Sequence, residues 1–291
     1  MKGVTKADLG LMVVAVVWGI NLSVVKQTIS EMLPMSFTAA RFSVASLLLV
    51  LGLVITEGGF LLNRRDLKQI LFLGLLGHAS YQVMFINGID RTNASVAALI
   101  MATNPIFVLL IDSIALRRRP SLRVAAGMCL SLAGVTAIMA TSPGGQGASD
   151  FLLGNLLVLF GSICWAVYTA LSRSILKRYS PLRLTATTMA LGTIFIDAAA
   201  IPSFLAQDWH AISATGWAGF LYSLGLALVL SYLLWSFGVQ RIGPDRTAVY
   251  QNLIPVVAML AAVLMLGERM TLTQLAGSLF VLVGIYVTRK A

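Results

Sequence analysis

The amino-acid sequence predicts an all-α integral membrane protein of ten transmembrane helices, built as two five-helix repeats of opposite orientation. Three features predict this fold class. Of the 291 residues, 58% are hydrophobic and 11% are charged, against roughly 45–50% and about 25% in ordinary soluble domains. The apolar residues form runs of about 18–25 residues, the length that crosses a hydrocarbon core. The third feature is a similarity between the two halves of the chain.

The second half of the sequence repeats the first. The stretch Arg91–Gly134 recurs 150 residues later, and the parts upstream of it align at an offset of 147, so that Trp18 aligns with Trp165. Self-similarity over a whole half of the chain indicates one hydrophobic unit written twice. We expect a first repeat at residues 1–141, an inter-repeat loop at 142–151 and a second repeat at 152–291.

Polar clusters divide the first repeat into five spans. The first apolar run follows Lys2 and Lys6, and because no A-x-A cleavage site comes after it, we expect a retained helix and not a removed signal peptide. The remaining runs end at short polar stretches such as Arg64-Arg65. The expected spans are residues 8–27, 35–55, 67–89, 93–114 and 122–141.

The second repeat is divided in the same way. A loop of turn-forming residues, Ser142–Gly147, precedes its first run and is the natural hinge between the halves. The connections are too short for a soluble domain. The expected spans are residues 152–174, 182–205, 214–239, 244–266 and 271–288.

Lysine and arginine predict the orientation of these helices. With the N-terminus inside, seventeen cationic residues fall on the cytoplasmic side, and only Lys26, Arg91 and Arg269 fall outside. We therefore expect a multi-pass protein of a bacterial cytoplasmic (inner) membrane with both termini in the cytoplasm. Because five helices per repeat is an odd number, the second repeat enters the membrane from the opposite side.

The net charge of +10 has the same explanation, so no nucleic-acid partner is expected. Cys129 and Cys164 lie inside apolar runs without a CxxC or Cys/His partner, which argues against a disulfide or a metal site. We expect no cofactor. Inverted repeats instead suit a carrier, because two similar units of opposite orientation can exchange conformations around one site at the midplane.

Several motifs resemble the EamA-type drug/metabolite transporters. They are Trp18-Gly19, the Asn93-x-Ser95-x-Ala97 start of the fourth span, Pro105, and Leu266-Gly267-Glu268-Arg269 before Thr271. The resemblance covers both halves. It implies ten helices in two inverted halves, a cavity between them, and export of small metabolites, amino acids included. The sequence departs from the pattern at Arg118, where the first half would often carry a glutamate like Glu268.

The third span presents one polar face. His78, Tyr81, Gln82 and Phe85 are spaced at i, i+3, i+4 and i+7, so they share one side of an otherwise aliphatic helix. This spacing favours a cavity wall that hydrogen-bonds and stacks on a solute. The alternative is a histidine satisfied by a neighbouring helix.

The fourth and ninth spans carry prolines in corresponding positions. Pro105 and Pro255 each interrupt the backbone hydrogen bonds of a membrane helix, and paired interruptions are a sequence pointer to a central binding site. The alternative is a kink that serves packing alone. The polar or flexible residues expected beside them in the site are Met101, Asn104, Tyr250 and Asn252.

Aromatic residues and one arginine complete the predicted site. Trp18 and Trp165 lie well inside their spans, away from the interfaces where tryptophan is common. Trp165 and Tyr168, three residues apart, would present an aromatic surface to the cavity; packing in the core or against lipid is the alternative. Arg41 lies inside the second span and either snorkels outward or binds a substrate carboxylate.

Other residues suggest packing roles. Asp197 is deep in its span but stands alone, and we expect Glu268 to be structural. Glycines in the fifth and tenth spans are spaced for close helix contact. They suit packing of these two helices on each other or a homodimer face. The glycines are Gly127, Gly134, Gly277 and Gly284.

The sequence favours a transporter that exports small metabolites by alternating access around a central cavity, with amino acids, aromatic ones among them, as substrates. A carrier for another solute class, such as a drug or a nucleotide sugar, is the alternative. A membrane-embedded enzyme is disfavoured because no catalytic or metal-binding motif is present. A channel is disfavoured by the absence of charged rings and of a filter-like glycine loop.

Overall fold

The computed structural model describes residues 5–115, 122–139, 148–268 and 271–289. All of the regular secondary structure in this part of the chain is helical and none of it is strand, which confirms the all-α membrane class. Eight of its helices are long and apolar enough to cross a membrane. The total of ten spans and the orientation of the termini remain predictions. Arg118, Arg269 and the Ser142–Gly147 loop lie outside the described residues.

In the first half, the third span is one helix with a π-helical middle and the fourth is broken in two. The elements are α1 (Lys6–Thr28), α2 (Pro34–Glu57), α3 (Leu67–Gly74), η1 (Leu75–Ser80), α4 (Tyr81–Arg91), α5 (Ala94–Met101), α6 (Asn104–Ala115) and α7 (Leu122–Met139).

The second half has the same irregularities in the same places. Its third helix also contains a π-helical segment, and its fourth contains a short 3₁₀ segment. The elements are α8 (Ala148–Leu176), α9 (Pro181–Ala206), α10 (Ala214–Tyr222), η2 (Ser223–Leu230), α11 (Ser231–Ile242), α12 (Pro244–Val249), η3 (Tyr250–Leu253), α13 (Ile254–Leu266) and α14 (Leu272–Arg289).

Local chemistry fixes the ends of several helices. A capping box starts α1: the Thr5 hydroxyl accepts from the Asp8 N–H at 3.3 Å, and the Asp8 carboxylate accepts from the Thr5 N–H at 2.8 Å. At the other end of a helix, Gly58 stops α2 and Gly267 stops α13, with φ angles of 73° and 64°. Glycine adopts this left-handed conformation without the strain that a Cβ would add.

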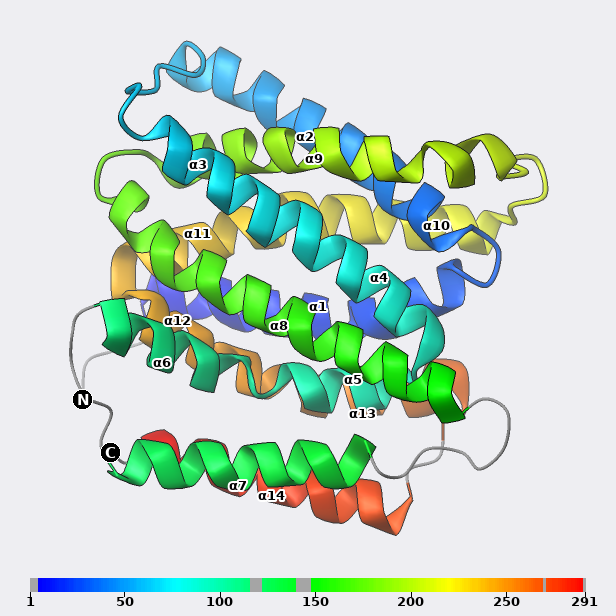
Figure 1. Cartoon of the computed structure of the whole chain (residues 1–291). Helices are drawn as coiled ribbons and strands as arrows, with labels where there is room; N and C mark the ends of the chain where they lie inside the picture. The colour runs from blue at the N-terminus through cyan, green and yellow to red at the C-terminus, as the bar shows by residue number, and fades with distance from the viewer. Residues whose placement is uncertain (1–4, 116–121, 140–147, 269–270, 290–291) are drawn as a thin grey trace.

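The helices form one bundle whose two halves intermesh. Figure 1 shows α2 beside α9 at one edge of the bundle and α7 beside α14 at the other, with α1, α8 and α11 between them. Gly127, Gly134, Gly277 and Gly284 are buried where α7 packs on α14 in the same chain. These two helices are therefore repeat partners in contact.

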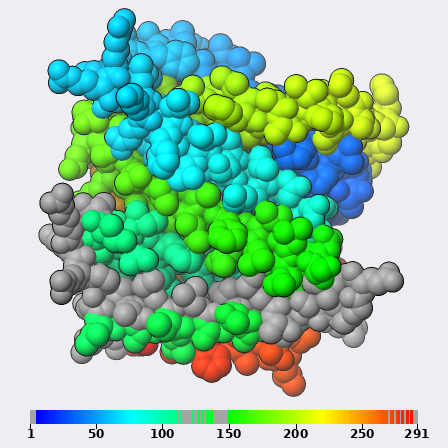
Figure 2. All heavy atoms as spheres, viewed as in Figure 1, coloured from blue at the N-terminus to red at the C-terminus, as the bar shows by residue number. Residues whose placement is uncertain are grey.

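The outer surface of the bundle is apolar. Ile55, Leu205 and Leu264 are each at least 80% exposed, and such an envelope suits hydrocarbon and not water. On the face seen in Figure 2, α3 and α4 cover the space between α9 and α8. Buried polar side chains such as Arg41, His78 and Gln82 lie inside this envelope.

Three glycines, Gly74, Gly77 and Gly192, allow η1 and the last turn of α3 to pack closely against α8 and α9. A Cβ at Gly192 would lie 2.5 Å from the His78 Cβ and 2.7 Å from the Gly74 carbonyl oxygen. A Cβ at Gly77 would overlap the Tyr168 ring. Small residues allow membrane helices to approach this closely. The close approach sets the position of the segment that carries the polar face of the third span.

We expect Gly192→Ala to lower the melting temperature of the purified protein in detergent by several degrees. The added methyl group has no space, and overpacking of this kind costs about 1–3 kcal/mol. Gly52→Ala is the matched control, because a Cβ at Gly52 would meet no atom within 4 Å. Equal melting temperatures for the two variants would contradict the close packing of α9 on η1.

Candidate functional site

A cluster of aromatic rings lies where the two halves meet. The repeat mates Trp18 of α1 and Trp165 of α8 have ring centroids 5.5 Å apart. Tyr232 and Trp235 of α11 join them at 5.1 Å from Trp165 and 5.3 Å from Trp18 respectively. Tyr81 of α4 lies 5.3 Å from Trp165. Edge-to-face and tilted ring pairs at these distances add stability beyond that gained by burying the rings.

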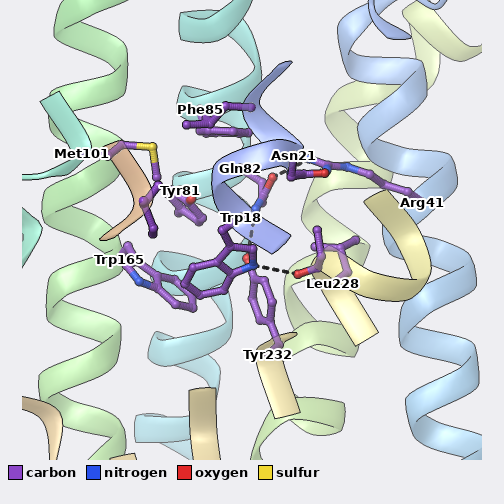
Figure 3. Close-up of a pocket in the computed structure, with 13 residues that line it drawn as sticks. Trp18, Asn21, Arg41, Tyr81, Gln82, Phe85, Met101, Trp165, Leu228 and Tyr232 are labelled. Carbon is purple, nitrogen blue, oxygen red and sulfur yellow. Dashed lines mark hydrogen bonds between the residues drawn. The ribbon is translucent and has the colours of Figure 1, made fainter. Parts of the chain in front are cut away.

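The cluster walls a small cavity between the halves, shown in Figure 3. Its volume is about 30 Å³, which is space for a water molecule or so and not for a metabolite. The rings are therefore closed on one another in this conformation. The lining residues are Trp18, Asn21, Leu22, Arg41, Tyr81, Gln82, Phe85, Met101, Trp165, Ala227, Leu228, Tyr232 and Ile254.

Among the described residues of this lining, Arg41 is the one that carries a charge. It is 1% exposed, so the guanidinium lies in the protein interior and does not snorkel outward. Its Nη1 donates to the Ser223 hydroxyl at 2.7 Å and its Nη2 donates to the Gln82 side-chain oxygen at 2.8 Å. The guanidinium carbon also lies 4.6 Å from the centroid of the Phe37 ring, a cation–π distance.

No acidic side chain pairs with Arg41 among the described residues. Both hydrogen-bond partners are neutral, and the Nε donor is buried without a partner. Charges inside membrane proteins are normally paired or mark a substrate path. The cavity is therefore an electropositive, aromatic site suited to an anionic group.

Gln82 joins the arginine to the aromatic cluster. Its side-chain oxygen accepts from Arg41, and its Nε2 donates to the Tyr232 hydroxyl oxygen at 3.0 Å. The oxygen and the nitrogen of this side-chain amide therefore each have a partner, and the residue is 3% exposed. Tyr81, Gln82 and Phe85 share the cavity face, as their spacing in α4 predicts.

His78 does not share that face. It lies in η1, where the wider π-helical turn changes the angle between successive side chains. Its Nε2 hydrogen-bonds the Thr188 hydroxyl at 3.0 Å, and its ring packs between Tyr168 and Tyr232 at 5.1 and 5.3 Å. The structure thus places the histidine against a neighbouring helix, the alternative that the sequence left open.

Four other predicted residues lie outside the cavity lining. Asn104 joins α6 to α8 by donating to the Ser162 carbonyl at 2.7 Å. Tyr168 is buried behind Trp165, with ring centroids 5.1 Å apart. The Tyr250 hydroxyl hydrogen-bonds the Asp8 carboxylate at the start of α1. Asn252 is part-buried, and its side-chain oxygen has no partner.

The paired prolines sit just after the breaks in the fourth and ninth spans. α5 ends at Met101 and Pro105 follows in the first turn of α6; η3 ends at Leu253 and Pro255 follows in the first turn of α13. Met101 and Ile254, which flank these breaks, both line the cavity. Proline has no backbone N–H, so the break leaves no unpaired donor at this residue.

Sequence reasoning missed two important lining residues, Asn21 and Tyr232. Asn21 lies three residues after Trp18, a spacing that places both on one face of α1 and could have identified it. Tyr232 is the second residue of α11, as Gln82 is of α4, a correspondence that comes from the structure and not from the offset of 147 that aligns this part of the repeats. Neither stands in a motif of its own.

Two acidic residues have defined structural partners. Glu268 accepts from the Ala94 N–H at 2.9 Å, the Ser95 N–H at 3.1 Å and the Ser95 hydroxyl at 2.6 Å, so it caps α5 from the opposite half of the chain. Asp197 accepts from the Ser43 hydroxyl at 2.9 and 3.1 Å and lines a separate cavity between α2 and α9. No cluster of metal-binding side chains occurs in the described part of the chain.

Comparison with known proteins identifies the same family in both halves of the chain. The sequence model of the EamA-like transporter family matches residues 5–140 and again residues 152–289. A protein of Archaeoglobus fulgidus named an uncharacterized transporter is 28% identical, over 93% of this chain and 94% of its own. A solved crystal structure is 17% identical with a TM-score of 0.70, covers 98% of this chain and 96% of its own, and therefore shares the fold.

Two further relatives have names that state a cargo. A probable amino-acid metabolite efflux pump of Salmonella typhimurium is 24% identical, over 95% of this chain and 92% of its own. A probable terminal-alkyne amino-acid exporter of Streptantibioticus cattleyicolor is also 24% identical, over 98% and 94%. The similarity in each case spans nearly the whole of both proteins.

We expect Glu268→Ala to speed amide hydrogen exchange in the first turn of α5. Loss of the carboxylate leaves two backbone N–H groups without their acceptor, at a cost of about 1–2 kcal/mol. Glu31→Ala is the matched control, because Glu31 accepts from Ser213 N–H at 2.8 Å at the start of α10. That variant should speed exchange at residues 213–217 and leave residues 94–97 unchanged. The same exchange profile in both variants would contradict the capping role.

Proposed function

The chain belongs to the EamA-like transporter family, and from that membership and the geometry of the cavity we propose that it exports amino acids, aromatic ones among them, by alternating access. It is a multi-pass membrane transporter whose helices leave no room for a soluble catalytic domain in the described residues. The cargo and the mechanism are the parts that need argument.

The buried Arg41 guanidinium carries the proposal on cargo. It faces the cavity without an acidic partner among the described residues, and a substrate carboxylate would provide one. An arginine fork suits a planar carboxylate. The aromatic walls, Trp18, Trp165 and Tyr232, suit a planar or apolar side chain. The names of the two amino-acid relatives support the same cargo.

The repeat supports the mechanism. Trp18 and Trp165 occupy the same position in the two repeats, and their rings are in contact. A pseudo-twofold axis that relates the repeats would therefore pass close to the cavity. We infer two inverted repeats, residues 1–141 and 152–291, with both termini in the cytoplasm. Each repeat then moves against the other while the cavity stays near mid-depth. The closed rings and the small volume suit an occluded conformation between the two open ones.

The purified protein in liposomes should exchange internal unlabelled amino acid for external labelled phenylalanine or tryptophan well above protein-free liposomes. An exchange assay reports binding and reorientation whatever the driving force. A nucleotide sugar and a lipophilic cation complete the panel as other solute classes. Exchange of either of these with no exchange of any amino acid would contradict the proposed cargo and leave the family membership unaffected.

Trp165→Leu should reduce the exchange of phenylalanine more than that of leucine, by roughly three- to tenfold. The substitution keeps an apolar side chain but removes the ring contact, and such aromatic contacts are worth about 0.5–1.5 kcal/mol. Trp217→Leu is the matched control, because Trp217 is 39% exposed and lies outside the cavity lining. Equal losses for both substrates in Trp165→Leu would remove this ring from the site.

A further inference from the structure

Three buried side chains in the cavity lining each have one polar atom without a partner. Arg41 Nε and Trp165 Nε1 are donors and Asn21 Oδ1 is an acceptor, and the residues are 1%, 2% and 7% exposed. The donors do not satisfy the acceptor, because none of the three atoms has a hydrogen bond although all three residues line the same cavity. Of the two donors, only the arginine carries a charge that a substrate could neutralise. The great majority of buried polar atoms in proteins have a partner. The exceptions at one small site require a physical reason.

We propose that Asn21 accepts a hydrogen bond from the substrate's α-ammonium while Arg41 Nε donates to its carboxylate. The substrate class is then the zwitterionic α-amino acids, as distinct from simple carboxylic acids and simple amines. This inference rests on the proposed function and assigns the polar end of the same site.

The charges of the lining explain why both groups of the substrate are read. No lining residue is acidic, so an ammonium must be held by a dipole and by ring faces. Asn21 supplies the dipole. Trp18 lies on the same face of α1, with its ring fixed by a 2.9 Å hydrogen bond from Nε1 to the Ala227 carbonyl, and a fixed ring can add cation–π attraction.

Compounds that have only one of the two groups are matched less well. An acid without the amine leaves the Asn21 oxygen buried and unpaired, which is costly. An amine without the carboxylate brings a second positive charge near Arg41 and leaves that charge without a counter-ion. A molecule that carries both groups satisfies the Arg41 donor and the Asn21 acceptor together.

The position of the two residues also orients the substrate. Figure 3 shows Asn21, Gln82 and Arg41 gathered at one end of the cavity, and Met101 and Trp165 at the other. The α-carbon therefore belongs at the arginine end. The side chain belongs between Trp165 and Met101, where space must be made because the present volume is about 30 Å³. The rings must separate before an amino acid enters.

The experiment measures selectivity ratios in the liposome exchange assay. Labelled L-phenylalanine is the transported probe, and the competitors are L-phenylalanine, 3-phenylpropionate, which lacks the amine, and 2-phenylethylamine, which lacks the carboxylate. For the unmodified protein we expect that the concentration of either one-group compound needed for half-inhibition is at least about tenfold higher than that of phenylalanine. Because each ratio is measured within one preparation, a partial loss of folded protein cancels.

The substitutions should act on different ratios. Asn21→Ala should bring 3-phenylpropionate close to phenylalanine and leave the preference over 2-phenylethylamine. Arg41→Met should do the reverse. Asn21→Asp, which keeps the size of the side chain and adds a charge, should strengthen the rejection of 3-phenylpropionate; it also serves if the alanine variant does not fold. Asn155→Ala is the control, because Asn155 is fully buried in α8 outside the cavity lining.

The outcomes separate the two proposals. If the unmodified protein is inhibited equally by 3-phenylpropionate and phenylalanine, or if the Asn21 variants keep the ratios of Asn155→Ala, Asn21 does not read the ammonium and this inference fails alone. If no amino acid is exchanged at all, the proposed function and the inference fail together. Opposite shifts for alanine and aspartate at position 21 support both, since a merely structural role would move them the same way.

Discussion

A single positive charge inside an apolar bundle constrains much of this structure. Transfer of an arginine to the centre of a membrane helix costs about 2.5–3.5 kcal/mol on insertion scales, so its surroundings must offset that cost. Here Ser223, Gln82 and the Phe37 ring hold the Arg41 guanidinium in place without neutralising it. Neutral hydrogen bonds orient a charge but leave its field in the cavity. The cavity therefore keeps a positive field that the proposed substrate carboxylate would neutralise.

The backbone irregularities gather around this charge. η2 carries Ser223, which holds Arg41, and also the Ala227 carbonyl, which fixes Trp18. The breaks in the fourth and ninth spans place Met101 and Ile254 at the cavity. Irregular backbone is tolerated within a membrane only where other protein groups or a polar space satisfy it. A regular helix at these three places would move Ser223, the Ala227 carbonyl, Met101 and Ile254 away from their positions at the cavity.

Sequence patterns predicted the helices well because bilayer thickness imposes one length on every span. The run expected at 182–205 corresponds to α9, Pro181–Ala206. The pair of prolines, Pro105 and Pro255, correctly indicated where two helices are interrupted. The same patterns assume a uniform helical turn, and this is where they were insufficient. The π-helical turn in η1 directs His78 to Thr188 instead of the cavity. Asn21 was missed for a different reason: its spacing from Trp18 was a usable signal, but its place beside Arg41 in one cavity lining depends on how the helices pack.

The site is also less symmetric than the scaffold that holds it. At the offset of 147, Asn21 corresponds to Tyr168 and Arg41 to Thr188, and Gln82 and Tyr232 are each the second residue of the helix that follows a π-helical segment, α4 and α11. Asn21, Arg41 and Gln82 all line the cavity. Of their counterparts, Tyr232 lines it as well, whereas Tyr168 and Thr188 lie outside the lining, and all three counterparts contact His78. The proposed exchange of conformations between the repeats requires similar backbones, and the matched π segments and proline breaks are consistent with that requirement. Recognition of a molecule with distinct ends requires unlike side chains. The first repeat therefore carries the polar end of the site, and the second contributes hydroxyl and aromatic groups that pack beside it.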